Sequence, residues 1–286
     1  MSSSTRTGSY NRILVDLNTQ CDFLLPKGAL PVSNRKQVLP NMRNLMSWAR
    51  TKRLPIISSL EAHRAGEHVR GLPLHCVDRS GGQKKLPFTL LPKRVLLFGD
   101  NTIDIPADIF RRFQQVIFTK RDRDFLSNPK ADRLVNNLDV NHLVVFGVVA
   151  EYCVKAAVLG LLTRRHRVVV VSDACGCWSS ADCELSIRQM DAKGAIIVTT
   201  EELISGRADE RIENSKRPMP VLEEDSLEEL EARMVEVSSA NTRISRAAKS
   251  ARNADDNAPD AELLRSSLNR HGLQTNVQSN SSQGLA

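Results

Sequence analysis

Short apolar segments rich in β-branched residues recur along roughly the first 200 positions of the chain. Several of them show no alternation of apolar and polar residues, which is typical of strands that are buried on both faces of a parallel sheet. We interpret seven segments as strands: 13–15, 55–57, 95–98, 116–119, 143–148, 168–171 and 196–199.

Between these segments, apolar residues repeat at the spacing of an amphipathic helix. The stretches are 38–49, 131–138, 153–162 and 181–193. Strands that alternate with helices predict an α/β fold, a three-layer sandwich built on a mostly parallel, doubly wound sheet. Ligands of such sheets bind beyond the carboxyl ends of the strands, so we expect the functional residues directly after the strands.

The composition of the chain changes near position 205. All twelve aromatic residues lie between Tyr10 and Trp178, and the chain from Arg207 onward carries 11 Lys and Arg against 14 Asp and Glu. We therefore expect one globular domain over 10–205. The polar tail over 206–286 has too few large apolar residues to offset the entropy lost on ordering, so we expect it to be largely disordered, with one helix over 225–237.

Composition and charge exclude several classes of protein. The longest apolar run, 144–150, is about a third of the ~20 residues that a membrane-spanning helix needs, so no membrane association is expected. The start of the chain lacks the apolar segment of a secretory signal, and six cysteines in 286 residues are too sparse for a disulfide scaffold. We therefore expect a cytoplasmic protein with reduced thiols.

The chain has a net charge of +7, which raises the question of nucleic-acid binding. Its basic residues are scattered, and no aromatic residues interleave with them to stack on bases. The charge therefore indicates a solvated basic surface, and we expect no nucleic-acid partner. Neither a dinucleotide-binding glycine motif nor a phosphate-binding loop motif occurs in the sequence.

Chemically useful side chains follow four of the predicted strands. A lysine after a strand is usually a solvated charge, and a lone cysteine is usually a small buried residue. Their convergence on the carboxyl edge of one sheet nevertheless predicts an active site. In chain order the candidates are Asp16 and Asn18, then Glu61, His63, His68 and His75, then Lys120, and finally Cys153.

Cys153 is the strongest candidate for a nucleophile. It falls in the first turn of the predicted helix 153–162, where unpaired N–H groups and the helix dipole favour thiolate over thiol. A nearby Lys120 ammonium would lower the pKa of the thiol further, and a carboxylate would accept its proton. Two backbone N–H groups of the turn would form an oxyanion hole, so the pattern predicts acyl transfer.

The acid and histidine cluster suggests a metal site. Glu61, His63, His68 and His75 offer carboxylate and imidazole ligands within 15 residues, and this set suits Zn²⁺, Fe²⁺ or Mn²⁺. The alternative is that these histidines are surface residues without a ligand.

Together these residues resemble the isochorismatase-like cysteine hydrolase superfamily, and within it the nicotinamidase and pyrazinamidase branch. The resemblance covers about residues 12–204, and the histidine cluster indicates the branch because isochorismatases proper lack it. The motifs that carry it occur in order: Gln20-x-Asp22-Phe23, Glu61-Ala62-His63, Leu74-His75-Cys76-Val77, Thr119-Lys120 and Gly147 to Val154.

The resemblance implies a catalytic triad of Asp, Lys and Cys. The cysteine attacks a carboxamide carbonyl, ammonia leaves, and water hydrolyses the thioester that remains. By position, Cys153 is the nucleophile and Lys120 is the lysine of the triad. The oxyanion hole is formed by N–H groups of Val149 and Cys153, with a cis peptide bond between Val148 and Val149.

The resemblance also implies a metal and a substrate. The metal ligands are Glu61, His63 and His75, with His68 as a further candidate, and the metal contacts the pyridine nitrogen of nicotinamide. Phe23 lies against the ring. The expected reaction converts nicotinamide to nicotinate and ammonia, and a homo-oligomer is expected by analogy with the family.

Two positions depart from the family pattern. Asn18 stands where the D-x-Q-x-D-F pattern places the catalytic aspartate, and an amide cannot accept the thiol proton. Asp16 lies two residues earlier, on the same face of an ideal strand, but it would have to move ~6–7 Å along the strand to act as the base. Glu61 replaces the usual aspartate of the metal site, and its extra methylene shifts the carboxylate.

Three interpretations of the first departure stay open: Asp16 is a displaced base, a Cys153 thiolate paired with Lys120 reacts without a base, or catalysis has been lost. The alternative functions are hydrolysis of another small amide, ureido or isochorismate-type substrate on the same fold, and a non-catalytic binding or regulatory role.

Overall fold

The seven segments interpreted as strands form one parallel sheet with the order β3-β4-β2-β1-β5-β6-β7. The computed structural model describes residues 10–67, 69, 71–100, 102–106 and 108–215. The strands are β1 (Tyr10–Leu17), β2 (Ile56–Glu61), β3 (Arg94–Leu97), β4 (Gln115–Lys120), β5 (Val140–Val148), β6 (Val168–Gly176) and β7 (Ile196–Val198).

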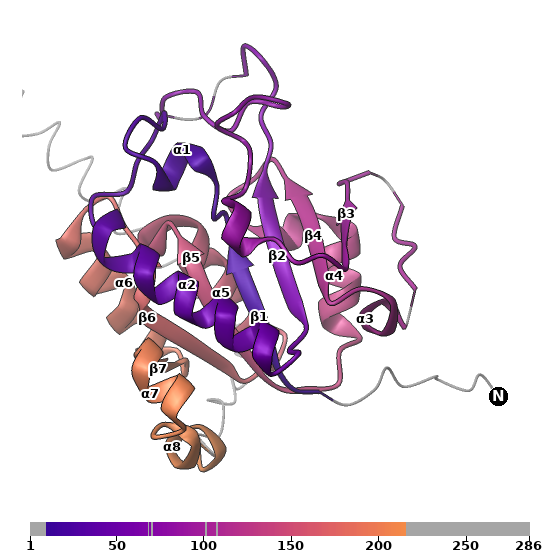
Figure 1. Cartoon of the computed structure of the whole chain (residues 1–286), viewed down its shortest axis with the longest axis vertical. Coiled ribbons are helices and arrows are strands. Elements are labelled where there is room, and N and C mark those ends of the chain that lie inside the picture. The colour runs from indigo at the N-terminus through magenta and orange to yellow at the C-terminus, as the bar shows by residue number, and fades with distance from the viewer. Residues whose placement is uncertain (1–9, 68, 70, 101, 107, 216–286) are drawn as a thin grey trace, which may run out of the picture. The chain divides into compact units, whose positions relative to one another are not determined.

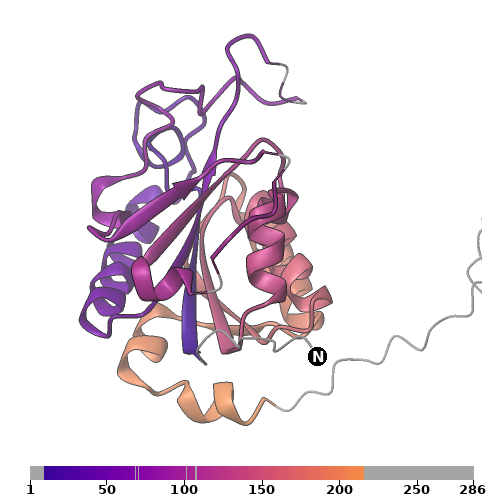
Figure 2. The ribbon, with the colours of Figure 1, turned by 90° about the vertical axis from the view of Figure 1, so that its right-hand side faces the viewer.

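Helices cover both faces of this sheet, so the predicted α/β sandwich of three layers is confirmed (Figures 1 and 2). One face carries α2 and α7, and the other carries α3 to α6. The helices are α1 (Cys21–Leu24), α2 (Arg35–Thr51), α3 (Ile109–Arg112), α4 (Pro129–Asn136), α5 (Lys155–Thr163), α6 (Ser180–Ala192), α7 (Thr200–Ser205) and α8 (Asp209–Glu213). Short turns are η1 (Pro87–Thr89), η2 (Phe125–Ser127) and the π-helical η3 (Ala150–Val154).

The central strands are apolar throughout because both of their faces are buried. In β1, Ile13 and Val15 pack into the core beneath α3 to α6, whereas Leu14 packs into the core beneath α2 and α7. Successive strand residues point to opposite faces, so a strand between two helical layers needs apolar residues at consecutive positions.

The strand order reverses at β1, which pairs with β2 on one side and with β5 on the other. At the carboxyl end of this junction, Leu17 lies in register with Gly147. A Cβ atom on Gly147 would lie only 2.1 Å from the carbonyl oxygen of Leu17, and its φ is +131°. Only glycine fits this close approach of two backbones, which lies just before the turn that carries Cys153.

The described chain continues past the predicted domain boundary at 205. Helix α8 buries Ile212 completely, and Asp209 forms an ion pair of 2.6 Å with Arg12 of β1. The predicted tail helix over 225–237 lies outside the described residues. Within the described ranges, no helix combines the length and the apolar character that crossing a membrane requires.

Asn128 connects the start of α4 to the end of β4. Its Oδ1 accepts hydrogen bonds from the N–H groups of Lys130 (3.0 Å) and Ala131 (3.3 Å), which makes it the N-cap of the helix. Its Nδ2 donates to the carbonyl oxygen of Thr119 over 2.9 Å. Pro129 occupies the first helical position, where its missing N–H group costs nothing.

Substitution Asn128→Ala should therefore lower the free energy of unfolding by about 2 kcal/mol. About 1 kcal/mol comes from the lost cap and about 1 kcal/mol from the lost buried hydrogen bond to Thr119. The control Asn136→Ala, at an exposed position of the same helix, should change it by less than about 0.5 kcal/mol. Denaturant unfolding followed by circular dichroism measures both, and equal stabilities would contradict the capping role.

Candidate active site

The carboxyl ends of β2 and β4 and the turn after β5 bring three reactive groups into contact. Sγ of Cys153 lies 3.5 Å from Nζ of Lys120 and 3.8 Å from Oε2 of Glu61. Nζ of Lys120 lies 2.8 Å from the same carboxylate oxygen. All three residues are buried. A thiol, an ammonium and a carboxylate in mutual contact can support nucleophilic chemistry.

The turn that carries Cys153 differs from the predicted start of a regular helix. After β5, the peptide bond between Val148 and Val149 is cis, as the resemblance implied. The π-helical turn η3 follows and leads directly into α5. The carbonyl oxygen of Val149 accepts hydrogen bonds from the N–H groups of Tyr152 (3.1 Å) and Val154 (3.0 Å). The oxyanion role of the Val149 and Cys153 N–H groups stays a prediction.

Strand register places Glu61 beside Lys120, because these two residues are partners at the ends of β2 and β4. The side-chain amide of Gln20 holds the backbone of Glu61: Oε1 accepts from its N–H group (2.8 Å), and Nε2 donates to its carbonyl oxygen (2.9 Å). Nζ of Lys120 also donates to the carbonyl oxygen of Asp122 over 2.8 Å. With Glu61 and Cys153, this contact gives each of the three ammonium N–H groups an acceptor.

Asn18 belongs to the same cluster, but it contributes a donor. Its Nδ2 donates to Oε2 of Glu61 over 2.8 Å. Its Oδ1 accepts from the hydroxyl group of Ser59 over 2.6 Å, and its backbone N–H group donates to the same hydroxyl over 3.1 Å. The amide therefore supports the carboxylate of Glu61 and takes no proton from the thiol.

Asp16 does not lie beside the thiol, in contrast to the interpretation of Asp16 as a displaced base. Its Oδ2 lies 3.0 Å from Nζ of Lys85 and 2.9 Å from the hydroxyl group of Ser58, and its Oδ1 accepts from the hydroxyl group of Thr19 over 2.8 Å. Asn18 has φ +50°, so the strand geometry ends before it, and Asp16 and Asn18 do not share a face. The rule of strand alternation does not extend across a left-handed residue.

Lys85 is a buried residue that sequence reasoning missed. Besides Asp16, its Nζ contacts the hydroxyl group of Thr19 (2.8 Å) and the carbonyl oxygen of Ser59 (3.3 Å). Burial lowers the pKa of Lys85, and the neighbouring Asp16 carboxylate opposes this effect. Next to Lys84 in the sequence, Lys85 has the pattern of a solvated loop, and no local signal indicates a buried ion pair.

Glu61, His63 and His75 form a possible metal site. Their candidate ligand atoms all lie within 4.8 Å of one another, and all three residues are buried. Oε1 of Glu61 lies 3.0 Å from Nε2 of His63 and 3.1 Å from Nε2 of His75. One carboxylate oxygen and two imidazole nitrogens form a set that suits Zn²⁺. His68, the fourth predicted ligand, lies outside the described residues.

The environment of His75 fits a cation in this position. Its Nδ1 lies 2.7 Å from the carbonyl oxygen of Pro73, which can only accept, so Nδ1 carries the proton of the neutral ring. Nε2 then turns its lone pair toward the carboxylate of Glu61. Two lone pairs converge on the same space, as in sites where a carbonyl orients a metal-binding histidine.

Asp22 and Gly82 fix the loop that carries His75. Oδ2 of Asp22 accepts a hydrogen bond of 2.7 Å from the N–H group of Cys76. A Cβ atom on Gly82 would lie 2.1 Å from this same oxygen, so a larger residue would displace the carboxylate. Phe23 is buried and packs edge-to-face on His75, with ring centroids 5.2 Å apart. Its predicted contact with a substrate ring stays a prediction.

Burial and the Lys120 ammonium act on the protonation of Cys153 and Glu61. Burial raises the pKa of the Cys153 thiol to about 12, although the Lys120 ammonium acts in the opposite direction. The expectation of a favoured thiolate at the helix start is therefore wrong, because desolvation outweighs the effect of the ammonium. Burial also acts to raise the pKa of Glu61, but the neighbouring Lys120 ammonium holds it well below its usual range. The resting site combines a thiol with an ionised carboxylate.

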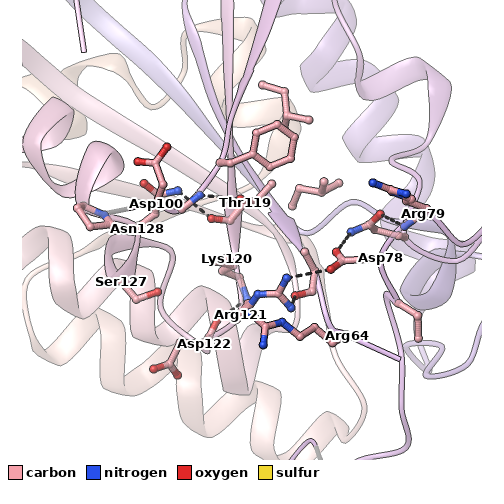
Figure 3. Close-up of a pocket in the computed structure, with 18 of the residues that line it drawn as sticks. Arg64, Asp78, Arg79, Asp100, Thr119, Lys120, Arg121, Asp122, Ser127 and Asn128 are labelled. Carbon is pink, nitrogen blue, oxygen red and sulfur yellow. Dashed lines mark hydrogen bonds and ion pairs between the residues drawn. The ribbon is translucent and has the colours of Figure 1, made fainter. Parts of the chain in front are cut away.

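A cavity of about 940 Å³ borders Lys120 (Figure 3). Arg121 crosses it to an ion pair of 2.9 Å with Asp78, which Figure 3 shows as a dashed line. Leu60 and Thr119, which directly precede Glu61 and Lys120 in β2 and β4, line this cavity together with Lys120. Since Cys153 does not line this cavity, it is not the space in front of the thiol.

The sequence of this chain is similar to those of known proteins. Residues 12–202 match the model of the isochorismatase domain. Over 211 residues the chain is 25% identical to a nicotinamidase of Escherichia coli strain K12, an alignment that covers 65% of this chain and 93% of that protein.

Two solved structures illustrate the similarity of the fold. A pyrazinamidase of Pyrococcus horikoshii in complex with zinc has a TM-score of 0.53 and 22% identity, with 66% of this chain and 99% of that chain covered. An isochorismatase family protein of Desulfovibrio vulgaris has a TM-score of 0.56 and 22% identity, with 70% and 100% covered.

The raised pKa of the thiol predicts slow alkylation of Cys153 at neutral pH. In metal-free protein, the rate with iodoacetamide should keep rising above about pH 9, where an unperturbed thiol is already largely ionised, because the thiolate fraction grows until the pH approaches about 12. Lys120→Met should slow the reaction further, since the ammonium favours the thiolate. Peptide mass spectrometry measures alkylation of Cys153 separately, and a plateau below pH 9 would contradict the prediction.

Proposed function

Since this chain belongs to the isochorismatase family of hydrolases, we propose that it is a cysteine amidohydrolase whose substrate is a small carboxamide, nicotinamide in particular. The observation that carries the proposal is the 3.5 Å contact between Sγ of Cys153 and Nζ of Lys120, next to the Glu61 carboxylate. The similarity to the Escherichia coli nicotinamidase supports this choice of substrate.

In the first step, Sγ of Cys153 attacks the carbonyl carbon of the amide. As the S–C bond forms, the proton on sulfur passes to Oε2 of Glu61, and the electron pair of the carbonyl group moves to its oxygen. The proposed oxyanion donors are the N–H groups of Val149 and Cys153. The Lys120 ammonium contacts both the sulfur and the carboxylate, so it stabilises the negative charge that moves between them.

In the second step, the C–N bond breaks and ammonia leaves with the proton that Glu61 accepted. The thioester on Cys153 is then attacked by water, whose proton passes to Glu61. The S–C bond breaks, the proton returns to sulfur, and the carboxylic acid is released. Each proton that the carboxylate accepts is thus given back within one cycle.

Glu61, His63 and His75 would hold a zinc ion in this enzyme, in keeping with the zinc in the Pyrococcus horikoshii pyrazinamidase. When bound, the ion would supply a positive site for a ring nitrogen of the substrate. Phe23 packs against His75 and offers an apolar surface for the same ring.

Purified protein should release ammonia from nicotinamide, and Cys153→Ala should reduce the rate at least about 10³-fold, because the change removes the attacking sulfur. The control Cys183→Ala removes a thiol of α6, outside the cluster, and should retain the parental rate. A coupled assay for ammonia measures all three proteins. The proposal fails if the parental protein releases no ammonia, or if Cys153→Ala releases it equally fast.

Metal-free protein should bind Zn²⁺, and His75→Ala should weaken the affinity at least about 10-fold by removing one ligand. His166→Ala should not change it, because His166 bonds to the carbonyl oxygen of Val135 and is no part of the site. Isothermal titration calorimetry measures the affinities. Turnover that survives complete removal of metal would instead favour a metal-independent amidohydrolase on the same fold.

A further inference from the structure

Glu61 presents its two carboxylate oxygens to two different sets of partners. Oε1 faces Nε2 of His63 at 3.0 Å and Nε2 of His75 at 3.1 Å. Oε2 lies 2.8 Å from Nζ of Lys120 and 3.8 Å from Sγ of Cys153. One buried carboxylate therefore belongs both to the candidate metal ligands and to the candidate catalytic groups.

The direction of Oε2 is set by Asn18. Nδ2 of Asn18 donates to Oε2 over 2.8 Å, while Oδ1 accepts from the hydroxyl group of Ser59. Since Ser59 satisfies the acceptor end of the amide, the donor end faces Glu61. The left-handed φ of +50° at Asn18 turns this side chain to the face where Ser59 and Glu61 lie. Asn18 is fully buried, so water does not compete for these bonds.

A carboxylate at position 18 would not fit this arrangement of charges. Among the described residues, Lys120 is the one lysine or arginine that bonds to the Glu61 carboxylate. A second carboxylate within hydrogen-bond distance of Oε2 would compete for that ammonium, and two buried like charges at about 3 Å cannot both ionise without a large penalty. The neutral amide of Asn18 and the long side chain of Glu61 therefore form a matched pair.

We propose that Glu61 is the catalytic carboxylate of this site as well as a metal ligand, and that Asn18 is the positioning residue that holds Oε2 against Lys120 and Cys153. This inference rests on the proposed function. Its consequence is that catalysis has not been lost with the aspartate at position 18. The carboxylate that accepts the thiol proton lies at the end of β2 instead of after β1, and the extra methylene of Glu61 brings it close to the sulfur.

The discriminating variant is Asn18→Asp. If the site lacks a catalytic carboxylate, this change should restore it and raise kcat. If Glu61 is that carboxylate and Asn18 positions it, kcat should fall at least about 10-fold with a smaller change in KM. The affinity for Zn²⁺ should change in the opposite direction and rise about threefold or more, because the new carboxylate competes for Lys120 and frees the Glu61 carboxylate for the metal. A merely structural role for Asn18 predicts that both quantities fall.

The double variant Asn18→Asp/Glu61→Asp tests whether a carboxylate at position 18 can replace that of Glu61. The shorter side chain at position 61 withdraws its carboxylate from the thiol, and the new carboxylate at position 18 takes its place beside Lys120. This variant should recover at least about 10-fold of the kcat lost in Asn18→Asp. Asn136→Asp adds the same charge at an exposed position of α4 and should leave kcat, KM and zinc affinity unchanged.

Asn18→Ser removes the donor without adding charge. It should lower kcat about 5–10-fold and keep KM and zinc affinity within about twofold of the parental values. It also tests the positioning role of Asn18 if Asn18→Asp does not fold. The inference is overturned if Asn18→Asp raises kcat, or if Asn18→Ser retains the parental kcat.

The experiment also separates this inference from the choice of substrate. If the parental protein releases no ammonia from nicotinamide, the proposed substrate is wrong, and the alkylation rate of Cys153 replaces kcat as the measure of the thiol environment. Asn18→Asp should then still slow alkylation at about pH 9 and still strengthen zinc binding. If neither effect occurs, the proposal that Glu61 serves both the metal site and the thiol is overturned, whatever the substrate is.

Discussion

The ion pair between Glu61 and Lys120 is the interaction on which the site depends. Its 2.8 Å contact is buried, and a buried pair is stable only when the remaining donors and acceptors of both groups are satisfied. Here Lys120 has three acceptors, and the Glu61 carboxylate faces the donor of Asn18 as well as the histidines. The parallel register of β2 and β4 places the two residues side by side, so the fold itself fixes the pair.

A second buried pair, Asp16 with Lys85, lies at the neighbouring strand end. It connects β1 to the loop that precedes η1, and the hydroxyl groups of Thr19 and Ser58 complete its hydrogen bonds. The two pairs have different tasks. In the proposed mechanism the pair beside Cys153 carries the chemistry, whereas the other pair joins the loop to β1. Truncating either partner of such a pair leaves an uncompensated buried charge, which costs about 3–5 kcal/mol.

The sheet could be predicted from the sequence because burial on both faces gives the central strands continuous apolar runs. The partners of Cys153 were predictable in part, since Lys120 and Glu61 follow strands that end at one edge. The left-handed conformation of Asn18 and the partner of Lys85 were not, because both depend on contacts between distant segments. Helix α8 was missed since only Ala208 and Ile212 enter the core there, too few to form a pattern.

In the proposed mechanism, Cys153 forms a covalent bond with the substrate while the neighbouring ammonium and carboxylate stabilise the developing charge. Mass spectrometry of digested, acid-quenched samples taken during turnover of nicotinamide detects this bond. An acyl adduct is expected on the peptide that contains Cys153 and on no other cysteine peptide. Steady release of ammonia without an adduct on Cys153 at any quench time, or an adduct on another residue, would contradict this mechanism.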